Sequence, residues 1–205
     1  MKLEAILFDF DGVLADTESI HWECWSQILA TFGIALDWDT YGRQCIGVAD
    51  REVIASLCRL APSPVDFDRV WAQYPAKKQR FRDRVEAEPP ILAETVELLS
   101  SLAGYKLAVV SSSGRMEIEP VLVRAGIRDC FDAVVCGEDV KALKPAPDPY
   151  LKAAELLNVR SALVVEDSDA GIESARRAGF EALRIGTPAE LSMLLKRRLA
   201  RETRA

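Results

Sequence analysis

The feature that most limits what this chain can fold into is the alternation of short apolar runs with helical patterns. Five runs are predicted to be strands, at residues 3–8, 105–110, 131–136, 161–166 and 181–186. Four of them are almost continuously apolar, as strands covered on both faces are. Helical patterns follow at residues 92–102, 115–125, 148–157, 169–178 and 187–203. This order predicts an α/β fold, with a Rossmann-like, doubly wound parallel sheet.

Residues 16–87 break this alternation, because they contain helical patterns and no good strand. Helices are expected at 16–32, 39–45, 50–60 and 66–86, and Pro75 should kink or split the last of them. The segment also contains all the tryptophans, and we expect them to form the core of a small helical unit: Trp22, Trp25, Trp38 and Trp71. The chain is therefore predicted to have an α/β core, 1–15 with 88–205, interrupted by an all-helical domain, 16–87.

Single residues mark some of the expected helix ends. Asp16 stands where the first helix of the helical unit should begin, and its side chain suits an N-cap. Gly104, Gly126 and Gly179 follow the ends of helical patterns in the α/β core. We expect these glycines to adopt the left-handed conformation that commonly ends a helix.

Composition excludes several classes of protein. The 205 residues are 49% hydrophobic, which is enough for a full core, and a net charge of −6 argues against a nucleic-acid partner. Five irregularly spaced cysteines without a CxxC pair indicate neither a disulfide framework nor a zinc site, and they favour a cytoplasmic location. Because only four apolar residues precede the first aspartate, we expect neither a signal peptide nor a membrane partner.

Polar side chains follow several of the predicted strands at the point where each strand ends. The first strand is followed by Asp9 and Asp11, and a later strand is followed by Glu166 and Asp167. Serines, a glycine and an arginine follow the run at 105–110, and a lysine lies in the "KPAPD" loop: Ser111, Ser112, Ser113, Gly114, Arg115 and Lys144. Ligands of open α/β sheets bind outside the carboxyl ends of the strands. We therefore expect one polar cluster there.

The chemistry of this cluster indicates phosphoryl transfer. Four carboxylates in one crevice would repel one another unless a divalent cation lay between them, and an all-oxygen set suits Mg²⁺ better than Zn²⁺. Ser111, backbone N–H groups at a helix start and Lys144 could bind the oxygens of a phosphate group. Charge neutralisation and positioning are what phosphoryl transfer requires.

The presence of two aspartates suggests that they have different roles in the reaction. Asp9 could attack phosphorus and form an aspartyl phosphate, while Asp11 protonates the leaving oxygen and later activates water. Gly12 allows a tight turn beside them. Each residue taken singly has an ordinary explanation, such as a turn aspartate, a helix N-cap or a solvated loop charge. Their joint placement favours the functional interpretation.

Four segments resemble the motifs of the haloacid dehalogenase superfamily, in the same order and at similar intervals. They are "DFDGV", "VVSSS", "KPAPD" and "VVEDSDAGIESARRAG", and the resemblance covers nearly the whole chain. The helical insert resembles the cap domain of that superfamily. The segment "DTESIHWECW" resembles the start of the cap in the beta-phosphoglucomutase-like branch, which includes many sugar-phosphate phosphatases.

The resemblance implies a role for each matching residue. Asp9 would be the nucleophile and Asp11 the acid and base, while Ser111 and Lys144 would bind the transferring phosphoryl group. Mg²⁺ would be bound by Asp9, by the backbone carbonyl of Asp11 and by Asp167, with Glu166 assisting. Dehalogenases and phosphonatases of the superfamily lack the second aspartate of the first motif. Its presence here therefore argues against both activities.

The resemblance leaves hydrolysis and mutase chemistry as alternatives. A beta-phosphoglucomutase needs a cationic grip on a second phosphate, from a basic residue before a Gly-Val pair in the cap and an arginine shortly after. Here Ile46 replaces the basic residue, although Arg51 could supply the arginine. Gly114 and Arg115 replace the Lys-Asn pair that follows the second motif. These departures favour a phosphatase acting on a small phosphate monoester, such as a sugar phosphate.

Further residues are candidates for substrate binding. In the core these are Ser112, Ser113 and Arg115, and in the helical insert they are His21, Gly47 and Lys78. His21 is either an ordinary surface histidine or a residue near the substrate and Asp11. Lys77 and Lys78 are expected to be solvated, unless one of them reaches a phosphate or a hydroxyl group of the substrate.

Two other classes of protein compete with an enzyme. A phospho-receiver module has a similar acidic site, but it lacks a helical insert and an acid at the position of Asp11. A catalytically silent binding module would be indicated by a missing motif residue, and none is missing. We expect a small phosphate ester as the partner, and a monomer or a weak homodimer.

Overall fold

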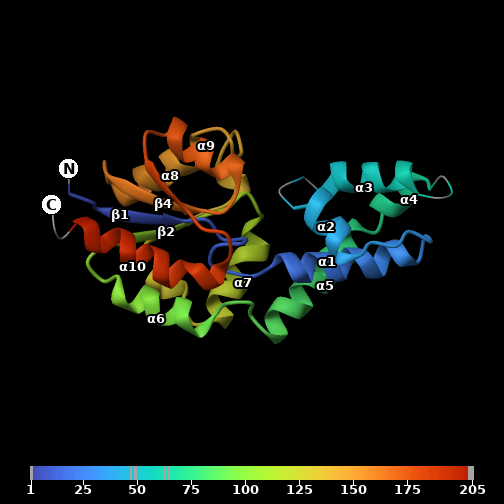
Figure 1. Ribbon diagram of the computed structural model, residues 1–205, viewed down its shortest axis with the longest axis horizontal. Coiled ribbons are helices and arrows are strands. Elements are labelled where there is room, and N and C mark those ends of the chain that lie inside the picture. Colours follow the sequence, from blue (N-terminus) through green and yellow to red (C-terminus); the bar gives the residue numbers. More distant parts are fainter. Residues whose placement is uncertain (1, 47, 49, 62, 64, 203–205) are drawn as a thin grey trace. The chain divides into compact units, whose positions relative to one another are not determined.

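The computed structural model describes residues 2–46, 48, 50–61, 63 and 65–202. The chain divides into two compact units, one of Met1–Asp16 with Pro89–Ala205 and the other of Thr17–Glu88 (Figure 1). Across the described ranges, no helix is both long enough and apolar enough to cross a membrane. The first unit is called the core unit below, and the second the helical unit.

The core unit is built on a five-stranded sheet in the order β3-β2-β1-β4-β5. Every neighbouring pair of strands is parallel. The strands are β1 (Ala5–Phe8), β2 (Lys106–Val110), β3 (Ala133–Val135), β4 (Ala162–Glu166) and β5 (Glu181–Arg184). The predicted parallel sheet is confirmed, and the chain direction places the carboxyl ends of all five strands at one edge.

Helices cover both faces of this sheet, as the doubly wound prediction requires. Figure 1 shows α8 (Asp148–Leu157) and α9 (Asp169–Arg177) on one face, with α6 (Ala93–Ser101) and α10 (Leu191–Glu202) on the other. Helix α7 (Arg115–Arg124) connects β2 to β3. Three short 3-10 helices complete the core unit: η1 (Arg128–Cys130), η2 (Gly137–Asp139) and η3 (Pro188–Glu190).

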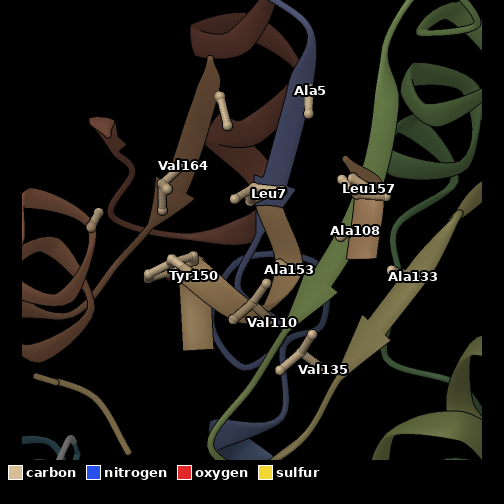
Figure 2. Close-up of a cluster of buried hydrophobic side chains, with 12 residues drawn as sticks. Ala5, Leu7, Ala108, Val110, Ala133, Val135, Tyr150, Ala153, Leu157 and Val164 are labelled. Atoms are coloured by element: carbon tan, nitrogen blue, oxygen red, sulfur yellow. The ribbon is translucent and has the colours of Figure 1, made fainter. Parts of the chain in front are cut away.

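The sheet register aligns alternate apolar side chains into one buried layer. Leu7 of β1 lies beside Ala108 of β2 and Val164 of β4, and Val110 lies beside Val135. Figure 2 shows these side chains together with residues of α8 that pack against them. Because successive strand residues point to opposite faces, this register also fixes the direction of the residues that follow each strand.

The helical unit contains α1 (Glu18–Ala30), α2 (Trp38–Gln44), α3 (Asp50–Leu60), α4 (Phe67–Trp71) and α5 (Tyr74–Ala87). The predicted helix over 66–86 is split between α4 and α5, as expected from its proline. Pro75 lies in the first turn of α5. A proline is tolerated there because the first N–H groups of a helix have no partner within the helix.

The prediction for the tryptophans holds for three of them and is wrong for Trp38. Trp25 is buried, while Trp22 and Trp71 are partly buried and pack against the same core cluster. Trp38 is 44% exposed at the first residue of α2. It stacks on Tyr41 at a centroid distance of 5.6 Å. A short helix with one buried residue covers too little surface to enclose an indole.

Two predictions about helix ends are wrong. Thr17, not Asp16, occupies the N-cap position of α1, and Asp16 donates its backbone N–H to the carbonyl of Pro90 at 2.8 Å. Gly104 does not adopt the left-handed conformation; it lies in a turn after α6 in which the Tyr105 N–H donates to the carbonyl of Leu102 at 2.9 Å. Gly126 and Gly179 do adopt that conformation, as predicted, with φ angles of 70° and 83°.

Candidate active site

Asp9 and Asp11 follow β1 on a tight turn. The N–H of Asp9 donates to the carbonyl of Val165 at 3.0 Å, so the pairing of β1 with β4 continues to this residue. The carbonyl of Phe10 then accepts backbone hydrogen bonds from Val13, Leu14 and Ala15. Asp9 is only 7% exposed. The backbone therefore fixes where both carboxylates emerge from the sheet.

Lys144 reaches the ends of three strands from the loop before α8. Its ammonium group donates to Asp9 Oδ1, to Glu166 Oε1 at 2.6 Å and to the carbonyl of Val110 at 2.9 Å. The side chain is 6% exposed. Since an ammonium group has three N–H donors, these contacts use all of them and hold its position.

The loop that carries Lys144 is itself anchored to α9. The hydroxyl of Ser174 donates to the carbonyl of Ala146 at 2.5 Å, and Arg177 donates to the carbonyl of Pro145 at 3.2 Å. Ser174 has no exposed surface. These contacts fix the backbone of the loop after Lys144, and so limit the positions that its side chain can reach.

Glu166 is completely buried at the end of β4. Its Oε1 accepts from Lys144 and, at 2.8 Å, from the hydroxyl of Tyr150. Its Oε2 accepts from the N–H groups of Asp167 and Ser168, both at 3.1 Å, and from the Ser168 hydroxyl at 3.0 Å. Five donors therefore surround one carboxylate.

Ser111 and Ser113 bring hydroxyl groups from the end of β2 to Asp11. The N–H of Ser111 donates to Val135, and its Oγ accepts from the N–H of Ser113 at 3.0 Å. The Ser113 hydroxyl donates to Asp11 Oδ2 at 2.9 Å, and Ser111 Oγ lies 3.4 Å from the same oxygen. The Asp11 carboxylate is thus held beside the serine loop.

Burial shifts the pKa values of the charged groups in different directions. It raises the pKa of Asp9 well above the ordinary range, although Lys144 opposes the shift. Burial alone would lower the pKa of Lys144, but Asp9 raises it well above its usual value. Burial would also raise the pKa of Glu166, but Lys144 and Tyr150 lower it. The fold thus favours charged Glu166 and Lys144, while burial makes a charge on Asp9 costly despite its contact with Lys144.

Three carboxylates converge closely enough to share a metal ion. Asp9, Glu166 and Asp167 each offer an oxygen, and these atoms lie within 4.8 Å of one another. A hard, all-oxygen donor set fits Mg²⁺. Gly12, at a φ of 76°, lies against Asp167, because a Cβ on Gly12 would stand 2.1 Å from Asp167 Oδ2. Only glycine fits this turn without displacing that carboxylate.

The remaining candidates from the core unit lie in different surroundings. Ser112 is exposed. The guanidinium group of Arg115 pairs with Asp139 at 2.5 Å and with Glu119 at 3.2 Å, and it also donates to the carbonyl of Val134. Arg115 therefore connects α7 to the segment around β3 and η2.

Of the candidates from the helical unit, His21 and Lys78 are described by their contacts within that unit, and Gly47 lies outside the described residues. His21 stacks on Phe81, with ring centroids 4.2 Å apart, and its Nδ1 lies 2.7 Å from the Lys77 ammonium. The ammonium of Lys78 lies 5.0 Å from the centroid of the Tyr74 ring.

The expectation that Lys77 is solvated is wrong. Its side chain is 2% exposed and pairs with Asp50 at 3.0 Å. Its ammonium group also lies over the rings of Trp25 and Phe81, at 5.7 and 5.8 Å from their centroids. Two of these partners, Asp50 on α3 and Trp25 on α1, are distant in sequence, so the charged pattern of the helix did not indicate them.

The sequence analysis did not identify Tyr150 or Ser168, which both hold Glu166. A usable signal was present for Tyr150. It follows Lys144 by six residues at the start of a helix that should pack on the sheet. A tyrosine buried at such a place needs a partner for its hydroxyl group.

Comparisons with known proteins give a matching family and several relatives. Residues 6–185 match the family described as "Haloacid dehalogenase-like hydrolase". A relative from Thermotoga maritima, "Phosphorylated carbohydrates phosphatase", is 32% identical over 88% of this chain and 84% of its own length. "Beta-phosphoglucomutase" from Bacillus subtilis is 27% identical over 90% of this chain and 84% of its own length.

A solved structure has a similar fold. It is that of CbbY from Rhodobacter sphaeroides in complex with phosphate, with a TM-score of 0.69 and 30% sequence identity. The match covers 88% of this chain and 85% of that chain. Phosphatases and a phosphosugar mutase are therefore both among the proteins that this chain is similar to.

Proposed function

The chain belongs to the haloacid dehalogenase-like hydrolases, and on that basis we propose that it is a Mg²⁺-dependent phosphatase acting on a small phosphate monoester. A sugar phosphate is the favoured substrate, since a similar protein is named as a phosphatase of phosphorylated carbohydrates. The observation that carries the proposal is the placement of Lys144 against Asp9, with Asp11 held separately by serine hydroxyls.

Asp9 is the nucleophile of the proposed reaction. Its carboxylate attacks phosphorus in line, the bond to the leaving oxygen breaks, and an aspartyl phosphate forms. Lys144 and Ser111 lie beside Asp9 and Asp11 and would bind the oxygens of the transferring group. Mg²⁺ would be held by Asp9, Asp167 and the carbonyl of Asp11, and would neutralise negative charge on the phosphoryl group.

Asp11 carries out the proton transfers. It first protonates the leaving oxygen, and it then takes a proton from the water that hydrolyses the aspartyl phosphate. The Ser113 hydroxyl, 2.9 Å from Asp11 Oδ2, orients this carboxyl group. Separate surroundings for two neighbouring acids let one act as nucleophile and the other as acid and base.

Contacts in the helical unit favour hydrolysis over mutase chemistry. The guanidinium carbon of Arg51 lies 5.0 Å from the ring centroid of Phe67 and 5.4 Å from that of Trp71. This arginine is therefore engaged with aromatic rings rather than presented for a second phosphate. Ile46 is an exposed apolar residue where a mutase has a cation. A phosphosugar mutase is the second candidate, because such an enzyme is among the relatives.

The proposal also covers the role of the helical unit, the location of the protein and its partners. We assign the helical unit the role of a cap that selects the leaving group and excludes water. Five free cysteines suit a reducing cytoplasm. We propose a monomer or a weak homodimer, without a nucleic-acid or membrane partner.

A substrate panel tests the proposed function. Purified protein is assayed for phosphate release from p-nitrophenyl phosphate, phosphorylated sugars and phosphorylated organic acids, with Mg²⁺ and then with excess EDTA. We expect release from one or more sugar phosphates with Mg²⁺ and none with EDTA. Beta-glucose 1-phosphate is also assayed with a bisphosphate activator. Conversion to an isomer without phosphate release would favour the mutase instead.

A further inference from the structure

Tyr150 is a buried polar residue without a role in the mechanism above. It lies in the first turn of α8 and has no exposed surface. Its hydroxyl group donates to Glu166 Oε1 at 2.8 Å, and its ring centroid lies 5.1 Å from the Lys144 ammonium. The same Glu166 oxygen accepts from Lys144. One tyrosine thus contacts both members of the buried pair that borders Asp9.

The hydrogen bonds of Glu166 leave it little capacity to bind a cation. A carboxylate has about four lone-pair sites, and five donors already occupy this one. Gly171 also packs against it, because a Cβ on Gly171 would stand 1.7 Å from Glu166 Oε1. Although Glu166 is one of the three clustered carboxylates, its hydrogen bonds hold Lys144 and the backbone of Asp167 and Ser168.

We propose that Tyr150 is a positioning residue for phosphoryl transfer, acting through Glu166 on Lys144. The Tyr150 hydroxyl occupies part of the accepting capacity of Oε1. Lys144 is therefore shared between Glu166 and Asp9 instead of being drawn to Glu166 alone. The inference rests on the proposed function, because it assumes that Lys144 binds the transferring phosphoryl group.

Loss of this hydroxyl group should have opposite effects on turnover and on metal binding. In Tyr150→Phe, Glu166 would attract Lys144 more strongly, and the ammonium would lie farther from Asp9 and from the phosphoryl oxygens. Turnover should then slow. Lys144 would also compete less with Mg²⁺ for Asp9, so Mg²⁺ should bind more tightly. If the substitution only disordered the site, both turnover and Mg²⁺ binding would become weaker.

The test compares Tyr150→Phe with wild type and with a matched control, Tyr105→Phe. Tyr105 is a half-buried tyrosine of the same unit, outside the site. Turnover of p-nitrophenyl phosphate gives kcat, calorimetry without substrate gives the Kd of Mg²⁺, and thermal melting reports folding. We expect kcat of Tyr150→Phe to fall about tenfold, the Kd to fall about threefold, and the control to match wild type.

A double-mutant cycle tests whether Tyr150 acts through Glu166. In a Glu166→Gln background, Tyr150→Phe should have little further effect on kcat or on the Kd. Additive effects of the two substitutions would overturn the proposal. It would also be overturned if Tyr150→Phe left kcat and the Kd unchanged, weakened Mg²⁺ binding or did not fold. If wild type releases no phosphate from any ester, the proposed function fails, and the Mg²⁺ titrations alone decide the role of Tyr150.

Discussion

The carboxylate of Asp167 lies so close to Gly12 that a Cβ at position 12 would stand 2.1 Å from Asp167 Oδ2. Gly12 also has a φ of 76°, a conformation that disfavours every L side chain. The turn that carries Asp9 and Asp11 and the acid loop after β4 therefore fit together only when position 12 lacks a side chain.

Gly12→Ala tests this close approach. We expect it to weaken Mg²⁺ binding by about 10- to 100-fold, because the new methyl group displaces Asp167. Gly126→Ala is a matched control, since Gly126 has a φ of 70° and nothing within 4 Å of an added Cβ. Both variants should lose about 1 kcal/mol of stability from backbone strain. Equal Mg²⁺ affinities of the two variants, measured by calorimetry, would contradict this account.

Asp11→Asn tests the proposed proton transfers. An amide keeps the shape of the side chain but cannot donate to the leaving oxygen or take a proton from water. We expect kcat to fall by about 10²- to 10⁴-fold. Because the nucleophile stays intact, substrate with a good leaving group should still phosphorylate Asp9, which mass spectrometry of quenched protein detects. Unchanged steady-state turnover would remove Asp11 from the mechanism.

Lys77→Ala tests the buried network of the helical unit. The change removes a buried side chain that pairs with Asp50 and lies over two aromatic rings. We expect it to lower the free energy of unfolding by about 2–4 kcal/mol, and Arg80→Ala, an exposed site on the same helix, by less than about 0.5 kcal/mol. Tryptophan fluorescence during urea denaturation reports this unit alone, because all four tryptophans lie in it. Equal losses would show that the network contributes little.

The cysteines should differ in reactivity on the folded protein. Burial raises the pKa of Cys136 to about 12 and that of Cys45 to about 11, so at pH 8 both are almost entirely thiols. Cys24 and Cys58 are also buried, whereas Cys130 is partly exposed. Iodoacetamide at pH 8 should therefore add one group, at Cys130, and five in urea. Peptide mapping that finds rapid labelling of Cys136 in the folded protein would contradict this.

The sequence predicted the sheet well because its signals are local. Nearly continuous apolar runs end in polar residues, and parallel strands bring those ends to one edge. Lys144 accordingly contacts both Asp9 and Glu166, although the two acids are 157 positions apart in the sequence. The alternation of strands and helices left few other arrangements of the chain.

Two of the errors come from partners that are distant in sequence, and one comes from the shortness of a helix. Lys77 looked solvated, because its partner Asp50 lies on another helix. Trp38 looked buried, because an indole is apolar, yet α2 is too short to cover it. Tyr150 was missed because the partner of its hydroxyl group, Glu166, lies across the crossover from α8 to β4. Periodicity describes which face of an element is apolar but not what that face meets.

The central claim is that Asp9 is the nucleophile of a Mg²⁺-dependent phosphatase. The most direct measurement is phosphate release from p-nitrophenyl phosphate and from the best sugar phosphate, by wild type and by Asp9→Asn, with saturating Mg²⁺. We predict release by wild type and a loss of at least about a thousandfold in Asp9→Asn, with the fold retained. Undiminished release by Asp9→Asn, or none by wild type with any ester, would contradict the account.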